Sequence, residues 1–337
     1  MPLIIERDAV LETYAQAADK GWVIPTICTE NLTCTEAILT AAKDHAEWLN
    51  QPDIPITIAM TNLYSHRSQS LNYTRTRRWD IGLRLFLADL EVLTAPGSPF
   101  QSLRVMIHLD HIQHDADREL LDWDVTPFSS IMFDASTLPF DQNIAATRHF
   151  VEKRGKAIVV EGACDEIVDA EGREVSKLTS PENAERYINQ TGVDLIVANL
   201  GTEHRASAAD LKYQGALARR IKERIGPKLV LHGCSSVSAD QLATLYDDGV
   251  CKVNIWTMLE RDSAPVLLKE MVTHAAQVAG AEAAAALQKE GLLGTEAEVS
   301  GRQNLDYFTT VYRQQIVFNS MKDIVRHWLN LWYTRQH

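Results

Sequence analysis

The chain of 337 residues lacks the features of a secreted, membrane-spanning or nucleic-acid-binding protein. Its first residues contain no basic region followed by an apolar core, which a signal peptide needs. No uninterrupted apolar run approaches the length that spans a bilayer. Lys and Arg number 33 against 45 Asp and Glu, and the basic residues are scattered. With a net charge of −12, neither nucleic acid nor a membrane surface is an expected partner.

Cysteine is scarce, and its spacing argues against a disulfide framework. The five cysteines are odd in number and form no Cys-x-x-Cys pair; they stand at positions 28, 34, 164, 234 and 251. Such a pattern is typical of cytosolic thiols. We therefore expect a soluble, acidic, cytoplasmic protein.

The chain also lacks repeats, low-complexity linkers and phosphate-binding glycine motifs. No Gly-x-x-x-x-Gly-Lys or Gly-x-Gly-x-x-Gly follows an apolar run, which argues against a nucleotide-binding fold. Hydrophobic residues make up 45% of the chain, enough for a sizeable core. The length fits either two average domains or one large α/β barrel.

What the sequence does contain is eight short apolar runs that alternate with amphipathic segments. We expect strands at 23–28, 54–60, 105–108, 129–134, 157–161, 194–199, 228–232 and 250–255. We expect helices at 8–20, 34–49, 79–93, 114–123, 141–154, 181–190, 207–225 and 238–247. Near-continuous apolar strands in this alternation are typical of a parallel sheet buried on both faces. Eight such units predict a closed (β/α)8 TIM barrel rather than an open doubly wound sheet.

Outside this alternation, three stretches stand apart. Residues from about 261 onward have helical spacing, with a break near 291–294. We expect the barrel to occupy 1–280 and a helical C-terminal extension, 281–337, to pack on the barrel or on a partner subunit. The polar segments 61–75 and 162–179 are expected to be loops, the first of them over a site.

Polar residues gather where the apolar runs end, and strand C-terminal ends meet at one mouth of a barrel. One run ends in His108, Asp110 and His111. The ends of later runs carry Asp134, Glu161, Asn199, His204 just beyond, His232 and Asn254. One interpretation is that these histidines are ordinary residues hydrogen-bonded to the backbone. The alternative is that His111, His204 and His232 bind Zn²⁺ and leave one position open, as in a catalytic site. Strand alternation would separate His111 from Asp110 unless the strand ends first.

These segments resemble, in family order, the class II (zinc-dependent) fructose/tagatose-bisphosphate aldolase family. The matching segments cover most of residues 8–280 and are 108–111, 132–140, 160–162, 191–194, 201–204, 231–235 and 252–255. By this resemblance, His111, His204 and His232 are the Zn²⁺ ligands. Asp110 corresponds to the acid/base at the C4 hydroxyl, and Asn254 to the asparagine that holds the donor enediolate.

The same resemblance implies the remaining roles and the reaction. Gly233 and Ser235 correspond to donor-phosphate contacts. Glu171 is the nearest counterpart of the glutamate that transfers a proton at C3, although the surrounding glycines are absent. The implied reaction is retro-aldol cleavage of a ketose, free or phosphorylated, through a zinc-stabilised enediolate. Its products are a dihydroxyacetone-type donor, with or without phosphate, and an aldehyde.

Several departures from the family pattern cluster around the donor pocket. Arg205 stands where glycine is usual, and either binds an anionic group or faces an acidic surface. Trp256, before Thr257, removes a carboxylate and adds bulk, and Asn62 lies in a replaced region after the second strand. The glycines of His-Gly-Gly-Ser-Gly are partly lost in 232–236. These residues, with Gly233 and Ser235, are our substrate-binding candidates, and the changes favour a non-standard substrate.

Two other functions stay open at this point. The family contains non-catalytic subunits that support an aldolase partner, and similar barrels carry metal-dependent isomerases or hydrolases. The three histidines together with Asp110 and Asn254 favour the enzyme. We expect one catalytic Zn²⁺, with other divalent metals as alternatives, a sugar or sugar-phosphate substrate, and a homodimer or homotetramer.

Overall fold

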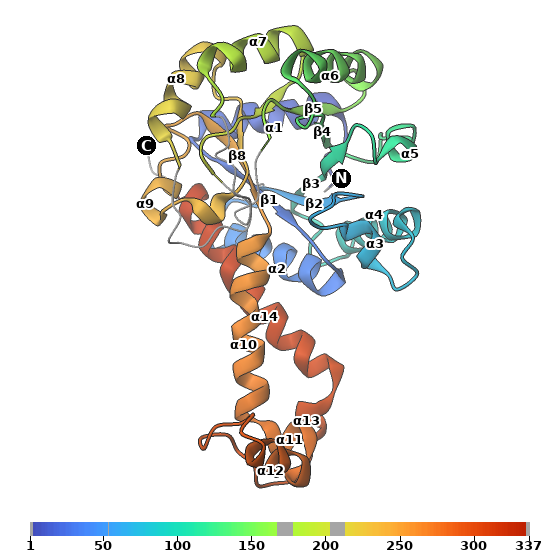
Figure 1. Ribbon diagram of the computed structural model, residues 1–337, viewed down its shortest axis with the longest axis vertical. Coiled ribbons are helices and arrows are strands. Elements are labelled where there is room, and N and C mark those ends of the chain that lie inside the picture. The colour runs from blue at the N-terminus through green and yellow to red at the C-terminus, as the bar shows by residue number, and fades with distance from the viewer. Residues whose placement is uncertain (1–2, 53, 167–177, 203–212, 335–337) are drawn as a thin grey trace.

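The computed structural model describes residues 3–52, 54–166, 178–202 and 213–334, which include a closed parallel barrel (Figure 1). The strands pair in chain order, and β1 closes the barrel against β8. They are β1 (Ile24–Cys28), β2 (Pro55–Thr61), β3 (Arg104–Gln113), β4 (Ser130–Asp134), β5 (Val159–Ala163), β6 (Leu195–Val197), β7 (Leu229–Leu231) and β8 (Val250–Ile255). The predicted TIM barrel is confirmed.

Helices surround the barrel, but three of them are shorter in the described residues than the sequence predicted, and the helix predicted at 207–225 begins at Gly215. The long ones are α1 (Arg7–Asp19), α2 (Leu32–Leu49), α4 (Trp79–Thr94), α6 (Phe140–Arg154), α7 (Pro181–Thr191) and α8 (Gly215–Ile225). The helices predicted at 114–123 and 238–247 are only four residues long in the structure, as α5 (Arg118–Leu121) and α9 (Ala239–Leu242). Before α5, the Asp117 carboxylate accepts hydrogen bonds from the backbone of Gln113 and Leu63, so this stretch forms turns.

The segment 61–75 is not wholly a loop, because it contains α3 (Gln69–Tyr73). The Gln69 amide oxygen accepts a hydrogen bond from the Thr61 backbone at 2.9 Å, and Ser70 donates to Asn62 at 2.5 Å. These buried contacts fold the segment back onto the end of β2, where it can reach the barrel mouth.

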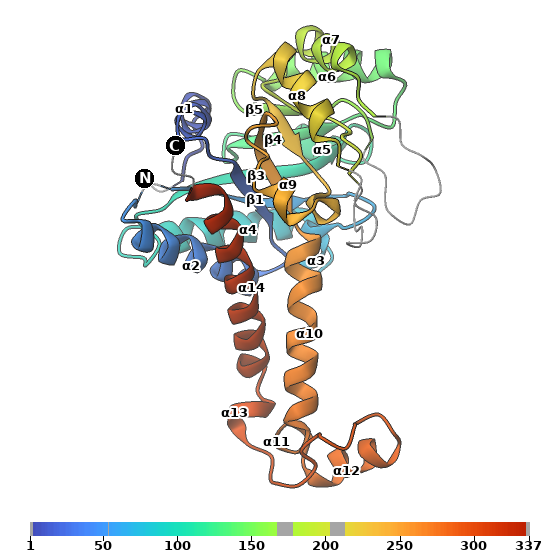
Figure 2. The same ribbon diagram turned by 90° about the vertical axis from the view of Figure 1, so that its left-hand side faces the viewer.

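The C-terminal part of the chain projects from the barrel as a helical stalk, which we define as α10 to α14 (Figures 1 and 2). Its helices are α10 (Thr257–Thr273), α11 (Ala275–Ala279), α12 (Ala281–Lys289), α13 (Leu305–Phe308) and α14 (Thr310–Tyr333). α10 leads outward, α11 to α13 form the far end, and α14 returns to pack against α2. The domain boundary at 280 stays a prediction.

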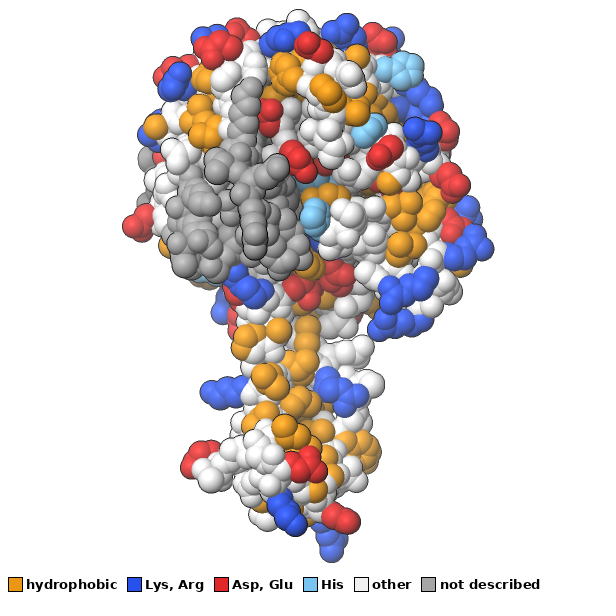
Figure 3. Space-filling view, viewed as in Figure 1, with side chains coloured by type: hydrophobic (Ala, Val, Ile, Leu, Met, Phe, Trp, Pro, Cys, Tyr) orange, Lys and Arg blue, Asp and Glu red, His pale blue; other side chains and the backbone are white. Residues whose placement is uncertain are grey.

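Apolar side chains are exposed along this stalk (Figure 3). Leu268 on α10 and Val311 on α14 are 66% and 68% exposed. Among the described helices, none is long and apolar enough to cross a membrane.

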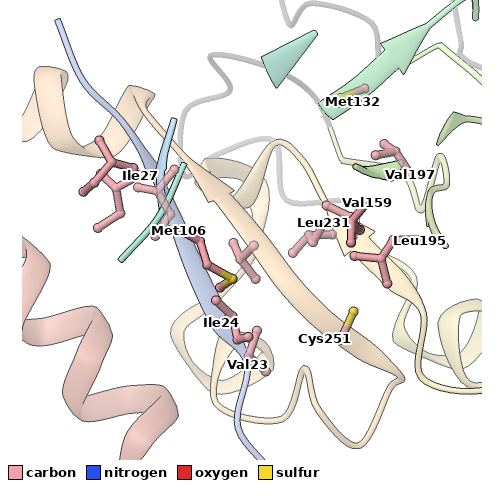
Figure 4. Packing of buried hydrophobic residues seen from close by; sticks show 14 of the residues in the cluster. Val23, Ile24, Ile27, Met106, Met132, Val159, Leu195, Val197, Leu231 and Cys251 are labelled. Atoms are coloured by element: carbon pink, nitrogen blue, oxygen red, sulfur yellow. The ribbon is translucent and has the colours of Figure 1, made fainter. Parts of the chain in front are cut away.

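Apolar side chains from many strands pack into one buried core on both faces of the barrel sheet (Figure 4). Ile24 and Ile27 on β1, Met106 on β3, Val197 on β6 and Leu231 on β7 are all buried. Every residue of β1, β2 and β8 is buried, which explains why these strands appear in the sequence as near-continuous apolar runs.

The end of α14 is part of the same core. Trp328 and Trp332 stack with ring centroids 5.3 Å apart, and both are buried. The Trp332 indole N–H donates to the Leu242 carbonyl oxygen at 2.9 Å. The end of α14 therefore packs against the barrel of the same chain.

We expect Trp332→Ala to lower the free energy of unfolding by about 3–5 kcal/mol, because it removes a buried indole and leaves a cavity. Trp48→Ala is the matched control, since Trp48 is 68% exposed. Urea denaturation measures both. Equal losses for the two variants would contradict the packing described for α14.

Candidate active site

An irregularity in β3 determines where His111 lies. His111 has a left-handed backbone, with φ of 49°, and the pairing of β3 with β4 shifts register between Leu109 and Ile112. Strict alternation would point His111 away from Asp110, but a bulge breaks the alternation. The strand continues to Gln113 instead of ending at 108 as predicted. As a result, ligand atoms of Asp110, His111 and His232 lie within 4.8 Å of one another.

The His111 ring is held from three directions. Its Nδ1 lies 2.9 Å from the Asp134 carboxylate, and its Nε2 lies 3.0 Å from Nδ1 of His232. The Tyr64 ring stacks on it with centroids 4.3 Å apart. Burial opposes ionisation of Asp134, but hydrogen bonds from His111 and Ser136 outweigh it and lower the pKa of that carboxyl. Asp134 therefore fixes the ring with Nε2 facing His232.

This arrangement fits a divalent metal ion. Two Zn–N bonds at a tetrahedral centre place their nitrogens about 3.3 Å apart, close to the 3.0 Å between His111 and His232. A carboxylate on the far ring nitrogen, here Asp134, is the usual support of a metal-binding imidazole. The other predicted ligand, His204, lies outside the described residues, as do Arg205 and Glu171.

Asp110 is a fully buried carboxylate whose two oxygens are both engaged. Oδ1 accepts from the Asn254 amide at 2.8 Å, and Oδ2 accepts from Arg67 at 2.7 Å and from the Cys28 thiol at 3.2 Å. Burial raises the pKa of Cys28, so its thiol keeps the proton that it donates.

The charge state of Asp110 follows from its neighbours. Burial favours the neutral acid, but His111, His232 and Arg67 outweigh burial and hold the pKa of Asp110 well below its ordinary value. A buried carboxylate that stays ionised next to a cluster of ring nitrogens can accept a proton from a bound substrate.

A second set of buried charges lies beneath Asp110 in the barrel. His108 Nε2 is 3.8 Å from Asp110 and 3.7 Å from Glu161, and its Nδ1 is 2.8 Å from the Ser130 hydroxyl. The Lys252 ammonium donates to Glu161 at 2.5 Å. Burial lowers the pKa of His108, with help from Lys252, and raises that of Glu161 despite the pairing with Lys252. His108 is thereby kept neutral.

Most of the described substrate-binding candidates line one small cavity beside His232. Its lining residues are Arg67, His232, Gly233, Cys234, Ser235, Asn254, Trp256 and Thr257. Gly233 adopts φ of 69°, a left-handed conformation that glycine takes without strain. Asn62 lies elsewhere, because its buried amide donates to Asp117 at 2.8 Å and accepts from Ser70.

Four residues whose side chains hydrogen-bond to or stack on the side chains of Asp110 and His111 were not among the predicted site residues: Arg67, Asp134, Tyr64 and Cys28. The sequence did indicate that Asp134 lies at the barrel mouth, because it ends an apolar run. Arg67 and Tyr64 lie in the polar segment 61–75, which was expected to cover a site, but nothing singled them out. Cys28 ends β1 and carries no pattern that indicates its contact with Asp110.

The buried Lys252–Glu161 pair makes stability depend on pH in a defined way. Because burial raises the pKa of Glu161, its protonation favours folding at low pH, and this benefit is lost as the pH rises through the folded-state value. We expect Lys252→Met to cost about 3–5 kcal/mol at neutral pH, because it leaves a buried charge unpaired.

The cost should be smaller at an acid pH of about 5 than at neutral pH, because burial raises the pKa of Glu161 and protonation removes the unpaired charge. Urea denaturation at the two pH values measures it. Lys153→Met, which removes an exposed partner of Asp122, is the control and should cost little at either pH. A loss for Lys252→Met that does not vary with pH would show that Glu161 does not become the unpaired charge.

Comparison with known proteins shows the family of the chain. The family model described as "Fructose-bisphosphate aldolase class-II" matches residues 8–334. The chain is 30% identical over 167 residues to the D-tagatose-1,6-bisphosphate aldolase subunit GatY of Klebsiella oxytoca, covering 47% of this chain and 57% of that protein. It is 28% identical over 180 residues to a fructose-bisphosphate aldolase of Giardia intestinalis, covering 45% and 55%. The chain thus spans little more than half the length of these relatives.

Solved structures share the fold. The YdjI aldolase of Escherichia coli K12 has a TM-score of 0.63 at 19% identity, with 95% of each chain covered. The fructose-bisphosphate aldolase of Campylobacter jejuni has a TM-score of 0.73 at 17% identity, covering 98% of this chain and 95% of that one. With a family match over nearly its whole length, the chain belongs to the class II fructose-bisphosphate aldolase family.

Proposed function

We propose that this protein is a metal-dependent aldolase that cleaves a ketose, or a ketose phosphate, between C3 and C4. The observation that carries the proposal is the ionised, buried carboxylate of Asp110 next to the facing imidazoles of His111 and His232. Membership of the class II family supports the same reaction.

His111 and His232 would hold a divalent ion, with His204 as the third ligand implied by the family resemblance. Imidazole ligands suit zinc, although other divalent metals bind similar sites. When bound, the ion would polarise the ketose carbonyl and stabilise the negative charge that develops on its oxygen. Asp134 would orient His111 toward it.

Asp110 would move the proton. Its carboxylate accepts the proton of the C4 hydroxyl, the C3–C4 bond breaks, and the bonding electrons pass to the donor half while C4 becomes an aldehyde. The Asn254 amide holds Asp110 through its N–H, and its buried oxygen has no hydrogen-bond partner among the described residues, so it can accept from a donor hydroxyl. C3 of the donor then takes up a proton. The resemblance implies that Glu171 donates this proton.

The donor pocket supports a substrate other than a standard sugar bisphosphate. Arg67 and the indole of Trp256 lie against each other at its edge, the guanidinium 4.8 Å from the ring centroid. Ser235 and Thr257 also line this pocket. Bulky side chains leave little room for a cradle of backbone N–H groups, so an anionic group of the donor would be bound here by side chains instead.

We further propose that the protein is a cytoplasmic homodimer or homotetramer. The exposed apolar residues of the stalk, such as Leu268 and Val311, support self-association. All five cysteines are free, which supports a reducing compartment.

Replacing the proton acceptor tests the mechanism. We expect Asp110→Asn to lower kcat by about 10²–10⁴-fold, because the amide keeps the shape of the carboxylate but accepts no proton. Zinc content, measured on the same samples, should stay the same. Asp122→Asn, at an exposed position, is the matched control. An Asp110→Asn protein that folds, binds zinc and cleaves at the wild-type rate would refute the role of Asp110.

A further inference from the structure

Arg67 reaches from the segment after β2 into the active site. Its side chain is 13% exposed, and its NH2 group donates to Asp110 at 2.7 Å and to the Cys28 sulfur at 3.2 Å. The guanidinium also lies 4.8 Å from the centroid of the Trp256 ring, within range of a cation–π contact. Two sides of the group are therefore fixed before any substrate arrives.

Three buried polar groups around the same cavity have no hydrogen-bond partner within the described part of the chain. They are Nε of Arg67, the hydroxyl of Ser235 and the amide oxygen of Asn254. Leaving such groups unpaired costs free energy, so a cavity lined by three of them favours a ligand that supplies the missing partners.

The chemistry of these groups defines the ligand. Arg67 Nε–H is a donor on a permanent cation, and the Ser235 hydroxyl can donate beside it, which together favour an anion. The Asn254 amide oxygen only accepts, so it favours a hydroxyl. The indole N–H of Trp256 is directed elsewhere, because it donates to Glu30 at 2.6 Å. A small molecule with an anionic group near a hydroxyl satisfies all three groups.

We propose that Arg67 determines specificity by binding the phosphate or carboxylate of the donor half of the substrate, together with the Ser235 hydroxyl. The inference rests on the proposed aldolase function and adds the class of donor to it. Trp256 holds the guanidinium plane in place. Because the same guanidinium also holds Oδ2 of Asp110, donor recognition is physically linked to the proton acceptor.

Hydrogen exchange into the donor alone separates donor binding from cleavage. The zinc-loaded protein is incubated in D₂O with dihydroxyacetone phosphate, hydroxypyruvate or uncharged dihydroxyacetone, and loss of the C3 proton is followed by NMR. This half-reaction does not involve the C4 hydroxyl on which Asp110 acts. The quantity compared is the exchange rate of each anionic donor divided by that of dihydroxyacetone.

We expect Arg67→Gln to lower this ratio by about ten-fold or more for the preferred anion, because a charged hydrogen bond is lost. Arg67→Lys keeps the charge without the planar fork and should give an intermediate ratio. Arg78→Gln is the matched control, since Arg78 pairs with Asp80 at the surface, and its ratio should equal that of wild type. Dihydroxyacetone phosphate and hydroxypyruvate distinguish a phosphate donor from a carboxylate donor.

The outcomes separate the two proposals. If the wild-type protein exchanges the donors and Arg67→Gln keeps the wild-type ratio of anionic to uncharged donor exchange, the role of Arg67 is overturned. The aldolase function then still stands. If Arg67→Gln does not fold, a wild-type ratio in Arg67→Lys overturns the role, and a lowered one supports it. Zinc-loaded wild-type protein that exchanges none of the three donors would overturn the proposed function itself.

Discussion

The left-handed backbone at His111 is the constraint on which the active site depends. Asp110 and His111 are adjacent in a strand, and regular alternation would place one inside the barrel and one outside it. The register shift between β3 and β4 at this point lets both side chains reach the barrel mouth. The hydrogen bond with Asp134 on β4 then fixes the His111 ring, so two neighbouring strands determine the position of one imidazole.

The second requirement is that Asp110 stays ionised although it is buried. Its carboxylate is anchored at one oxygen by Asn254 from β8 and at the other by Arg67 from beyond β2. Beneath it, His108 and the Lys252–Glu161 pair place further charged and polar groups in the barrel interior. A buried ion pair is weak evidence for stability, and these groups instead contribute to the electrostatic surroundings of Asp110, with His108 Nε2 3.8 Å from its carboxylate.

The barrel could be predicted from the sequence because parallel strands buried on both faces appear as apolar runs, and the polar ends of these runs predicted where Asp110, His111, His232 and Asn254 meet. The bulge at His111 could not be predicted, because it arises from pairing with β4. The contact of Arg67 with Asp110 could not be predicted either, because it depends on how the segment after β2 folds back. The lengths of α5 and α9 were overestimated: α5 begins only at Arg118, after the turns in which Asp117 accepts from Gln113 and Leu63, and α9 already ends at Leu242.

The measurement that tests the aldolase function most directly is product analysis on a panel of free and phosphorylated ketoses, with zinc content determined on the same sample. We predict that at least one ketose yields a three-carbon donor and an aldehyde. EDTA should abolish this cleavage, and added Zn²⁺ should restore it. Protein that holds zinc but cleaves no ketose in the panel would contradict the proposed function and would favour a non-catalytic supporting subunit.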